Sequence, residues 1–251
     1  MNTTDPRKRA ILDSMRGLVV SCQVQPDDPT YSEGFVVKMA QAAQWGGAAG
    51  IRANTPVQIR QIKERVSLPL IGLYKIWSET TNVFITPTLE SAQQVWAAGA
   101  EIVALDCTFQ INDDGQRACE LLPVVKQALP DAIIFADVSN HDEARNAVEQ
   151  GADIVGPTLR GYTPETAHIE EADYREFASM CRDFGNDVYM MMEGHIYTPE
   201  DAMKAMFLGA HSVVVGSAIT RPHLITKRFN DLLGGYESNW REAERSSHPN
   251  G

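Results

Sequence analysis

The sequence predicts an α/β fold in which eight parallel strands close into a single (β/α)8 TIM barrel. Eight short apolar runs alternate with helix-like segments, which is typical of a parallel sheet covered by helices. Gly-Ala pairs precede every second expected strand, at Gly47, Gly99, Gly151 and Gly209, and are almost evenly spaced. This period fits a barrel of four similar two-strand units, whereas an open doubly wound sheet does not require it. No linker or change of composition divides the chain, so we expect residues 1–251 to form one domain.

The expected strands are short apolar runs bounded by Gly, Pro, Asn, Asp or a polar side chain. They lie at residues 17–22, 48–52, 69–75, 101–106, 132–137, 153–158, 188–193 and 212–215. Because these runs are apolar along their length rather than alternating, we expect both faces of each strand to be buried.

The segments between the strands carry signals of helix initiation. Thr88 is expected to cap a helix that has Glu90 in its first turn, and Pro199 suits a first helical position. The expected helices lie at residues 6–16, 32–45, 55–66, 88–99, a segment ending near 129, 139–151, 172–184, 198–209 and 223–233. The barrel should therefore span about 17–233. We expect the polar tail 234–251 to be loosely ordered, with Tyr236 and Trp240 as candidates for docking on the barrel.

Composition narrows the class of partner. The chain has 43% hydrophobic and 22% charged residues and a formal net charge of -11, which argues against nucleic acid or an anionic membrane as partner. No signal peptide or membrane span is evident, so a cytoplasmic protein is expected. The four cysteines form no C-x-x-C pair and the six histidines have no ligand spacing, so we expect reduced thiols and no metal site.

The stretch GAHSVVVGSAITR, residues 209–221, has the features of a phosphate-binding loop. A β-branched run leads into Gly216 and Ser217, and then into a new helical turn. Glycine lets the backbone approach a ligand, and the N–H groups that open a helix point toward it. A phosphate loop near the last strands is common in TIM barrels. An ordinary strand-to-helix turn would give the same local pattern.

Polar side chains follow most of the expected strands, where a TIM barrel carries its chemistry. These rim residues are Gln23, Arg52, Lys75, Asp106, Asp137, Glu193 and the Gly216-Ser217 pair. Taken singly, each could be a helix cap or a solvated side chain. Buried charges need partners, so Arg52, Lys75, Asp106, Asp137 and Glu193 are expected to form one network around a cavity.

These groups suit proton transfer next to a carbonyl group. Apolar walls and the charge of Arg52 should lower the pKa of Lys75, so that its amine can act as a base. Burial after the apolar run VYMMM should raise the pKa of Glu193, so that it can exchange a proton. His195, beside Glu193, is the histidine expected at the site.

Motifs along the chain resemble one known family. They are SCQ at 21–23, GIRAN at 50–54, IGLYK at 71–75, ITPTLE at 85–90, ALD at 104–106, FADVS at 135–139, GADIVGPTLRGYT at 151–163, EG at 193–194, TPEDA at 198–202 and GAHSVVVGSAITRP at 209–222. In this order they are similar to the N-acylglucosamine-6-phosphate 2-epimerases, also called N-acetylmannosamine-6-phosphate epimerases, over about residues 17–233. The joint occurrence of IRAN, ITPTLE and VVGSAITRP makes the resemblance specific.

The resemblance implies a barrel of the ribulose-phosphate-binding type that interconverts N-acetylmannosamine 6-phosphate and N-acetylglucosamine 6-phosphate in sialic acid catabolism. It implies no metal or redox cofactor and suggests a homodimer. By the same resemblance, Lys75 is the catalytic lysine and Glu193 its acidic partner. Gln23, Arg52, Asp137 and Arg221 would hold the sugar and its phosphate, and Gly194, His195, Gly216 and Ser217 would bind the phosphate.

The sequence departs from the family pattern at a few positions. His195 stands where a basic residue is usual, Pro157 and Arg160 interrupt a threonine-rich segment, and the segment after Lys75 is less basic than expected. Two other functions stay open: another phosphosugar isomerase or lyase on the same barrel, and a phosphosugar-binding protein without turnover. The Asp-x-Lys-x-x-Asp array of the first class is absent, and both Lys75 and Glu193, which a pure sensor could lose, are present.

Overall fold

The computed structural model describes residues 3–24, 28–32 and 34–247, with side chains up to residue 234. Eight parallel strands form a closed barrel in chain order, and β1 pairs with both β2 and β8. Their bounds are β1 Gly17–Cys22, β2 Gly50–Asn54, β3 Leu70–Leu73, β4 Ile102–Asp106, β5 Ile133–Asp137, β6 Ile154–Gly156, β7 Tyr189–Glu193 and β8 Ser212–Val215. The predicted TIM barrel is confirmed.

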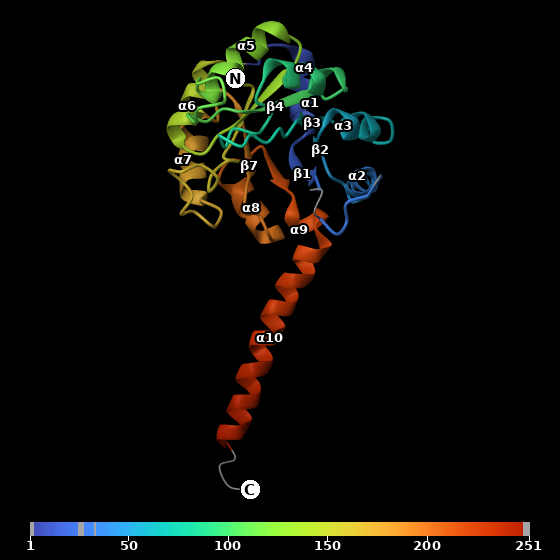
Figure 1. Cartoon of the computed structure of the whole chain (residues 1–251), viewed down its shortest axis with the longest axis vertical. Helices are drawn as coiled ribbons and strands as arrows, with labels where there is room; N and C mark the ends of the chain where they lie inside the picture. The colour runs from blue at the N-terminus through green and yellow to red at the C-terminus, as the bar shows by residue number, and fades with distance from the viewer. Residues whose placement is uncertain (1–2, 25–27, 33, 248–251) are drawn as a thin grey trace.

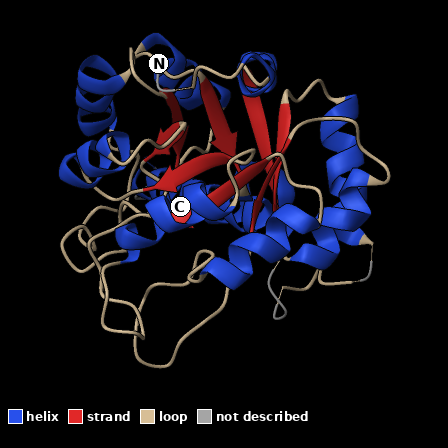
Figure 2. Cartoon of the chain, turned by 90° about the horizontal axis from the view of Figure 1, so that it is seen from above, coloured by secondary structure: helices blue, strands red, loops and turns tan. Residues whose placement is uncertain are grey.

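Helices surround the barrel, as Figure 2 shows from above. They are α1 Pro6–Ser14, α2 Phe35–Trp45, α3 Pro56–Lys63, α4 Leu89–Ala97, the short 3₁₀ helix η1 Ala118–Glu120, α5 Leu121–Ala128, α6 His141–Glu149, α7 Tyr174–Phe184, α8 Pro199–Phe207, α9 Ser217–Thr220 and α10 Pro222–Ser247. The predicted helix cap at Thr88 is confirmed, because its hydroxyl accepts a hydrogen bond from the Ser91 N–H. Pro199 opens α8 as predicted.

The helix-ending glycines before the even strands are also confirmed. Gly47, Gly99, Gly151 and Gly209 have φ between 85° and 110°, in the left-handed region that side chains other than glycine rarely adopt. Each lets the chain leave a helix on the outside and turn directly into β2, β4, β6 or β8.

One end of the barrel is closed by α1. Leu12 and Met15 are fully buried in the cluster that fills the barrel interior. Their carbonyl groups meet the start of β8, where His211 Nε2 lies 2.8 Å from Leu12 O and the Ser212 hydroxyl donates to Met15 O at 2.6 Å. Because the strand beginnings are sealed in this way, the opposite end, where the strands finish, is left to form a site.

Several predicted boundaries are wrong. β2 runs over Gly50–Asn54 rather than 48–52, and β6 ends at Gly156 rather than at 158. β3 ends at Leu73, so Lys75 lies beyond the strand and pairs with Ile85 in an isolated antiparallel bridge. Residues 235–247 were predicted to be loosely ordered, but they are helical, because α10 continues to Ser247 as one rod that projects from the barrel (Figure 1). The expected docking of Tyr236 and Trp240 concerns side chains outside the described ones. Among the helices that the structure describes, none is long and apolar enough to cross a bilayer.

Candidate active site

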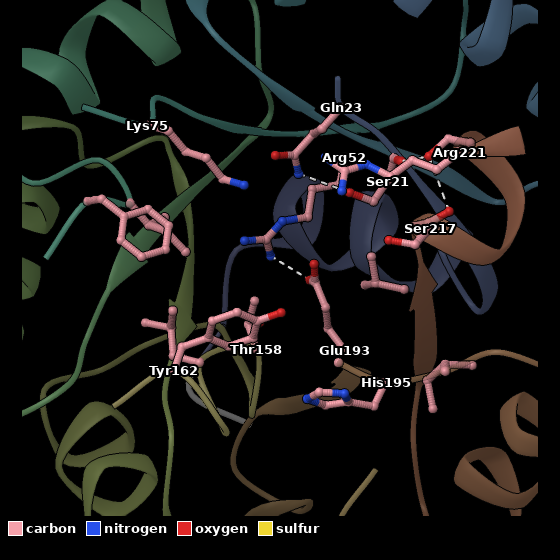
Figure 3. A pocket seen from close by; sticks show the side chains of 18 of the residues that line it. Ser21, Gln23, Arg52, Lys75, Thr158, Tyr162, Glu193, His195, Ser217 and Arg221 are labelled. Carbon is pink, nitrogen blue, oxygen red and sulfur yellow. Dashed lines mark hydrogen bonds and ion pairs between the residues drawn. The ribbon is translucent and has the colours of Figure 1, made fainter. Parts of the chain in front are cut away.

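A cavity of about 710 Å³ opens where the strands end (Figure 3). Its lining includes almost all of the predicted site residues: Gln23, Arg52, Lys75, Glu193, Gly194, His195, Gly216, Ser217 and Arg221. These residues come from segments spread over the whole chain, and the closed barrel brings them together.

The Arg52 guanidinium group is the centre of the ionic network. Arg52 lies in β2, is 1% exposed, and donates two hydrogen bonds to the Asp137 carboxylate, at 3.0 and 2.7 Å. Its Nη1 also donates to Glu193 Oε2 at 2.7 Å. A planar guanidinium with two carboxylates is held in one orientation, because each hydrogen bond fixes its plane.

Asp137 is fully buried and is not among the residues that line the cavity. Its two carboxylate oxygens are turned to Arg52, so the geometry gives Asp137 the role of positioning Arg52. Its predicted contact with the substrate stays a prediction.

The network is smaller than the sequence predicts, because hydrogen bonds and ion pairs among the described residues link Arg52 only to Asp137 and Glu193, and include neither the Lys75 amine nor Asp106. Oδ1 of Asp106 accepts hydrogen bonds from the N–H and hydroxyl groups of Thr108, two residues further along the chain. Burial raises the pKa of Asp106 to about 7 even though these hydrogen bonds favour the carboxylate. Only Oδ1 is satisfied by this local contact, because Oδ2 is buried without a hydrogen-bond partner among the described residues. Asp106 does not line the cavity.

Lys75 points its amine into the cavity from the side opposite Ser217 and Arg221 (Figure 3). Its backbone N–H donates to Asn54 Oδ1 at 2.8 Å, which ties the end of β3 to the end of β2. Burial, followed by the positive charge of Arg52, lowers the pKa of Lys75 to about 8, while Glu193 opposes part of the shift. The lowered pKa that the sequence predicts is confirmed, and a useful fraction of the amine is neutral near neutral pH.

Glu193 ends β7 and is 14% exposed. Burial raises the pKa of Glu193 to about 7, although the charge of Arg52 favours its ionised form. The predicted direction is again confirmed. After it, Gly194 and His195 both have positive φ, at 109° and 56°. A histidine in this conformation is strained, and its Nε2 is buried without a hydrogen-bond partner among the described residues.

The side of the cavity where the sequence predicts a phosphate site is formed by the turn from β8 into α9. Gly216 passes close to β1, where an added Cβ would meet the Ser21 Cβ at 3.4 Å. Arg221 follows α9 and forms an ion pair with Asp28 at 3.1 Å, and Asp28 also lies 2.8 Å from His223 Nε2. Arg221 lines the same cavity as Ser217.

Several lining residues were not predicted. Ser21 and Thr158 belong to the strand ends, and the rule that found Glu193 could have found them. Trp77, Phe84 and Tyr162 lie in loops after the strands, where no periodicity marks which side chains turn inward.

The assembled groups can move a proton at an acidic carbon. An amine with a pKa near 8 and a carboxyl with a pKa near 7 face one cavity, and a fixed guanidinium lies next to the carboxyl. In the described part of the chain, no group of three or more His, Cys, Asp or Glu side chains has the arrangement of a metal site.

Comparison with known proteins identifies the family. The NanE family model, described as "Putative N-acetylmannosamine-6-phosphate epimerase", matches residues 36–234. The chain belongs to this family of N-acetylmannosamine-6-phosphate epimerases. A relative in Caldanaerobacter subterraneus, described as "Putative N-acetylmannosamine-6-phosphate 2-epimerase", is 43% identical over 213 residues, which cover 85% of this chain and 89% of the relative.

Other members of the epimerase family are similarly close. A Clostridioides difficile relative with the same description is 40% identical over 220 residues, which are 87% of this chain and 97% of the relative. The solved structure of the N-acetylmannosamine-6-phosphate 2-epimerase from Clostridium perfringens superposes with a TM-score of 0.83 at 36% identity, covering 88% of this chain and 96% of that one. The resemblance drawn from the motifs is therefore confirmed.

Proposed function

We propose that this protein interconverts N-acetylmannosamine 6-phosphate and N-acetylglucosamine 6-phosphate by removing and returning the proton on C2. One observation carries the proposal: in an epimerase-family chain, the Lys75 amine, with its pKa lowered to about 8, faces the Arg52–Glu193 pair across the cavity. The substrate class is an amino-sugar phosphate.

Lys75 is the base. In the open-chain sugar, C1 is a carbonyl carbon and the C2 hydrogen is acidic. The neutral amine takes this proton, and the electron pair of the C–H bond moves to form an enolate whose charge lies on the C1 oxygen. Arg52 supplies fixed positive charge to that oxygen without having to reorient, which is the most effective form of electrostatic stabilisation.

Return of the proton to the opposite face of C2 completes the reaction. Glu193, with a pKa near 7, is the donor in a two-base reaction. Lys75 alone can also return the proton if the intermediate rotates above it. The C2 hydrogen leaves and returns as a proton, because the C1 carbonyl accepts the electron pair, so the proposed step contains no hydride transfer and needs no redox cofactor.

The remaining site residues hold the substrate. Gly194, His195, Gly216, Ser217 and Arg221 bind the phosphate, and Gln23 contacts the sugar together with Arg52. Binding a group remote from the reacting carbon fixes C2 over Lys75 and supplies energy for orientation. Because a phosphate dianion crosses a bilayer poorly, we place the enzyme where sugar phosphates are made, in the cytoplasm.

We also propose that the enzyme is a homodimer. Helix α10 leaves the barrel as an isolated rod (Figure 1), and Phe229, Leu232 and Leu233 on it are 67%, 76% and 62% exposed. Apolar side chains along one stripe of an isolated helix need a partner surface to be stable in water. A second copy of this chain is the partner we propose.

The proposal is tested by incubating the purified protein with N-acetylmannosamine 6-phosphate in deuterated water and following C2 by proton NMR. We expect N-acetylglucosamine 6-phosphate to form with deuterium at C2. Lys75→Met should lower the rate by about 10²–10⁴-fold, the range expected for loss of a general base. Lys38→Met, at an exposed position on α2, is the matched control and should keep full activity. Unchanged C2 exchange in Lys75→Met would remove Lys75 from the mechanism.

A further inference from the structure

We propose that the Lys75 side of the cavity is the N-acyl subsite, with Phe84 and Trp77 as its wall, and that it accepts apolar acyl groups longer than acetyl. The inference rests on the proposed function, and it adds which part of the substrate this wall selects. Two arguments support it: the position of C2 in the cavity, and the apolar character of the surface that lies next to that position.

The two ends of the cavity fix the direction of the substrate. Ser217 and Arg221 lie on one side and the Lys75 amine on the other, with Arg52 and Glu193 between them (Figure 3). If the phosphate binds at Ser217 and C2 lies at Lys75, carbons C3 to C6 span the cavity. The other two heavy-atom substituents of C2, which are C1 and the acylamino nitrogen, then lie at the Lys75 end.

Charge separates these two substituents. The C1 oxygen becomes negative in the enolate and is best placed against the Arg52 guanidinium. The acyl group is neutral and ends in an apolar carbon chain, so it is left with the apolar part of this end. That part is aromatic: the Lys75 Nζ atom lies 5.9 Å from the centroid of the Phe84 ring, and Trp77 stacks on Phe84 at 4.3 Å.

The aromatic wall and the base are held in one rigid unit. The N–H of Ile76 donates to Phe84 O at 3.0 Å, and the N–H of Thr86 donates to Tyr74 O at 2.9 Å. The Thr86 hydroxyl accepts from the Tyr74 N–H at 3.0 Å. These bonds clamp residues 84–86 against residues 74–76, so the distance between Lys75 and the wall is set by the backbone.

Solvent exposure increases along the wall from the bottom of the cavity to its opening. Ile85 is 2% exposed, Phe84 is half-buried, and Trp77, stacked on the outer side of Phe84, is 64% exposed. An acetyl methyl group reaches Phe84, and each added methylene extends along Trp77 toward solvent instead of meeting a barrier. An indole face at such a mouth favours apolar chains, because it buries part of them without enclosing them.

The test compares kcat/KM of the full-length enzyme for the 6-phosphates of N-acetyl-, N-propanoyl- and N-butanoylmannosamine. For the wild type we expect both longer substrates to lie within about tenfold of the acetyl substrate, below most of the 10–200-fold range for one methylene in a closed pocket. Trp77→Ala should lower the butanoyl-to-acetyl ratio by about tenfold. The ratio is insensitive to a general loss of folded enzyme, since that lowers both rates alike.

Two variants serve as controls. Arg221→Ala should lower kcat/KM for all three substrates by one common factor, because it acts at the phosphate end. Trp45→Ala, which removes the same side chain at a position 94% exposed on α2, should leave all three values unchanged.

The inference is wrong if the wild type rejects the propanoyl substrate by more than about 100-fold, or if Trp77→Ala leaves the ratio unchanged. A ratio that moves in Arg221→Ala instead would place the acyl group at the other end of the cavity and also contradict it. A wild-type protein that does not epimerise the acetyl substrate would overturn the proposed function and this inference with it. Turnover of the acetyl substrate with an unmoved ratio overturns this inference alone.

Discussion

Burial moves the pKa values of Lys75 and Glu193 toward each other, to about 8 and about 7. Epimerisation with two bases needs one proton on the pair. In one direction Lys75 is neutral and Glu193 protonated, and in the other Lys75 is protonated and Glu193 ionised. These two forms hold the same number of protons, so both directions of the reaction share one dependence on pH.

The pH profile of kcat/KM, which reports the pKa values of the free enzyme, therefore separates the two routes of proton return. With two bases, kcat/KM should fall below about pH 7, where both groups hold protons, and fall again above about pH 8, where both have lost them. With Lys75 alone, kcat/KM should rise through about pH 8 and stay level. The part of the profile above pH 8 distinguishes the two routes, because the substrate phosphate titrates near pH 6 and does not affect the rate there.

Glu193→Gln supplies the control for this reading. If Glu193 is the second base, the variant should lose most of its turnover and its remaining C2 exchange should keep no alkaline decline. An alkaline decline of equal depth in Glu193→Gln would assign that limb to another group and contradict the two-base route.

Individual site residues were predictable where they lie at the carboxyl end of a strand or within two residues after it. Gln23, Arg52, Lys75 and Glu193 were found in this way, because all eight strands finish at one end of the barrel. The same rule included Asp106, whose carboxylate accepts its hydrogen bonds from nearby Thr108 and stays out of the network. The hydrogen-bond donors of a buried carboxylate depend on the local backbone geometry, which cannot be predicted from the sequence.

The strand β3 illustrates how tightly an element is packed beneath the site. A Cβ added at Gly72 would lie 2.7 Å from both the Ala100 Cβ and the Val95 Cγ1 and 2.9 Å from the Ile59 Cδ1. Helices α3 and α4 can therefore approach β3 only because this residue has no side chain. The position of β3 also fixes that of Lys75, which lies two residues after the end of the strand.

We expect Gly72→Ala to lower the free energy of unfolding by about 1–3 kcal/mol, the usual cost of overpacking a core. Urea denaturation followed by circular dichroism measures this change. Gly46→Ala is the matched control, because that residue has helical backbone angles and an added Cβ would meet Ala42 O at 3.4 Å, so the change should be much smaller. Equal losses of unfolding free energy in the two variants would contradict this prediction, because they would show that the residues around Gly72 can move to accept a Cβ at no extra cost.

Among the elements, the prediction was most reliable where a local signal and a tertiary requirement agree. The even-numbered strands have both an apolar run and a preceding left-handed glycine, and all four exist; β4 and β8 lie within one residue of their predicted bounds, whereas β2 lies two residues later and β6 ends two residues earlier than predicted. The end of β3 was placed two residues too late, because the chain turns into the antiparallel bridge between Lys75 and Ile85. No local sequence pattern predicts that these two residues pair.

Over the whole molecule, the unpredicted feature is the length of α10. Gly234 and Gly235 read as a helix end, since a glycine inside a helix costs roughly 1 kcal/mol relative to alanine. The helix nevertheless continues to Ser247, through a segment that contains good helix formers such as Glu, Arg and Ala. Such a helix far from its own barrel gains little from packing in a monomer, and this is the reason to expect a second subunit.

The proposed dimer gives the last prediction. Phe229→Asp and Leu232→Asp place charges on the apolar stripe of α10, and we expect either to convert a dimer into a monomer in sedimentation-velocity experiments at micromolar concentration. The charge would have to be buried without a partner in the dimer interface, which opposes association. Asn230→Asp adds the same charge at an exposed polar position of the helix and should leave the dimer intact. A wild type that sediments as a monomer, or an Asn230→Asp variant that dissociates as readily as Phe229→Asp, would show that the apolar stripe does not hold two copies together.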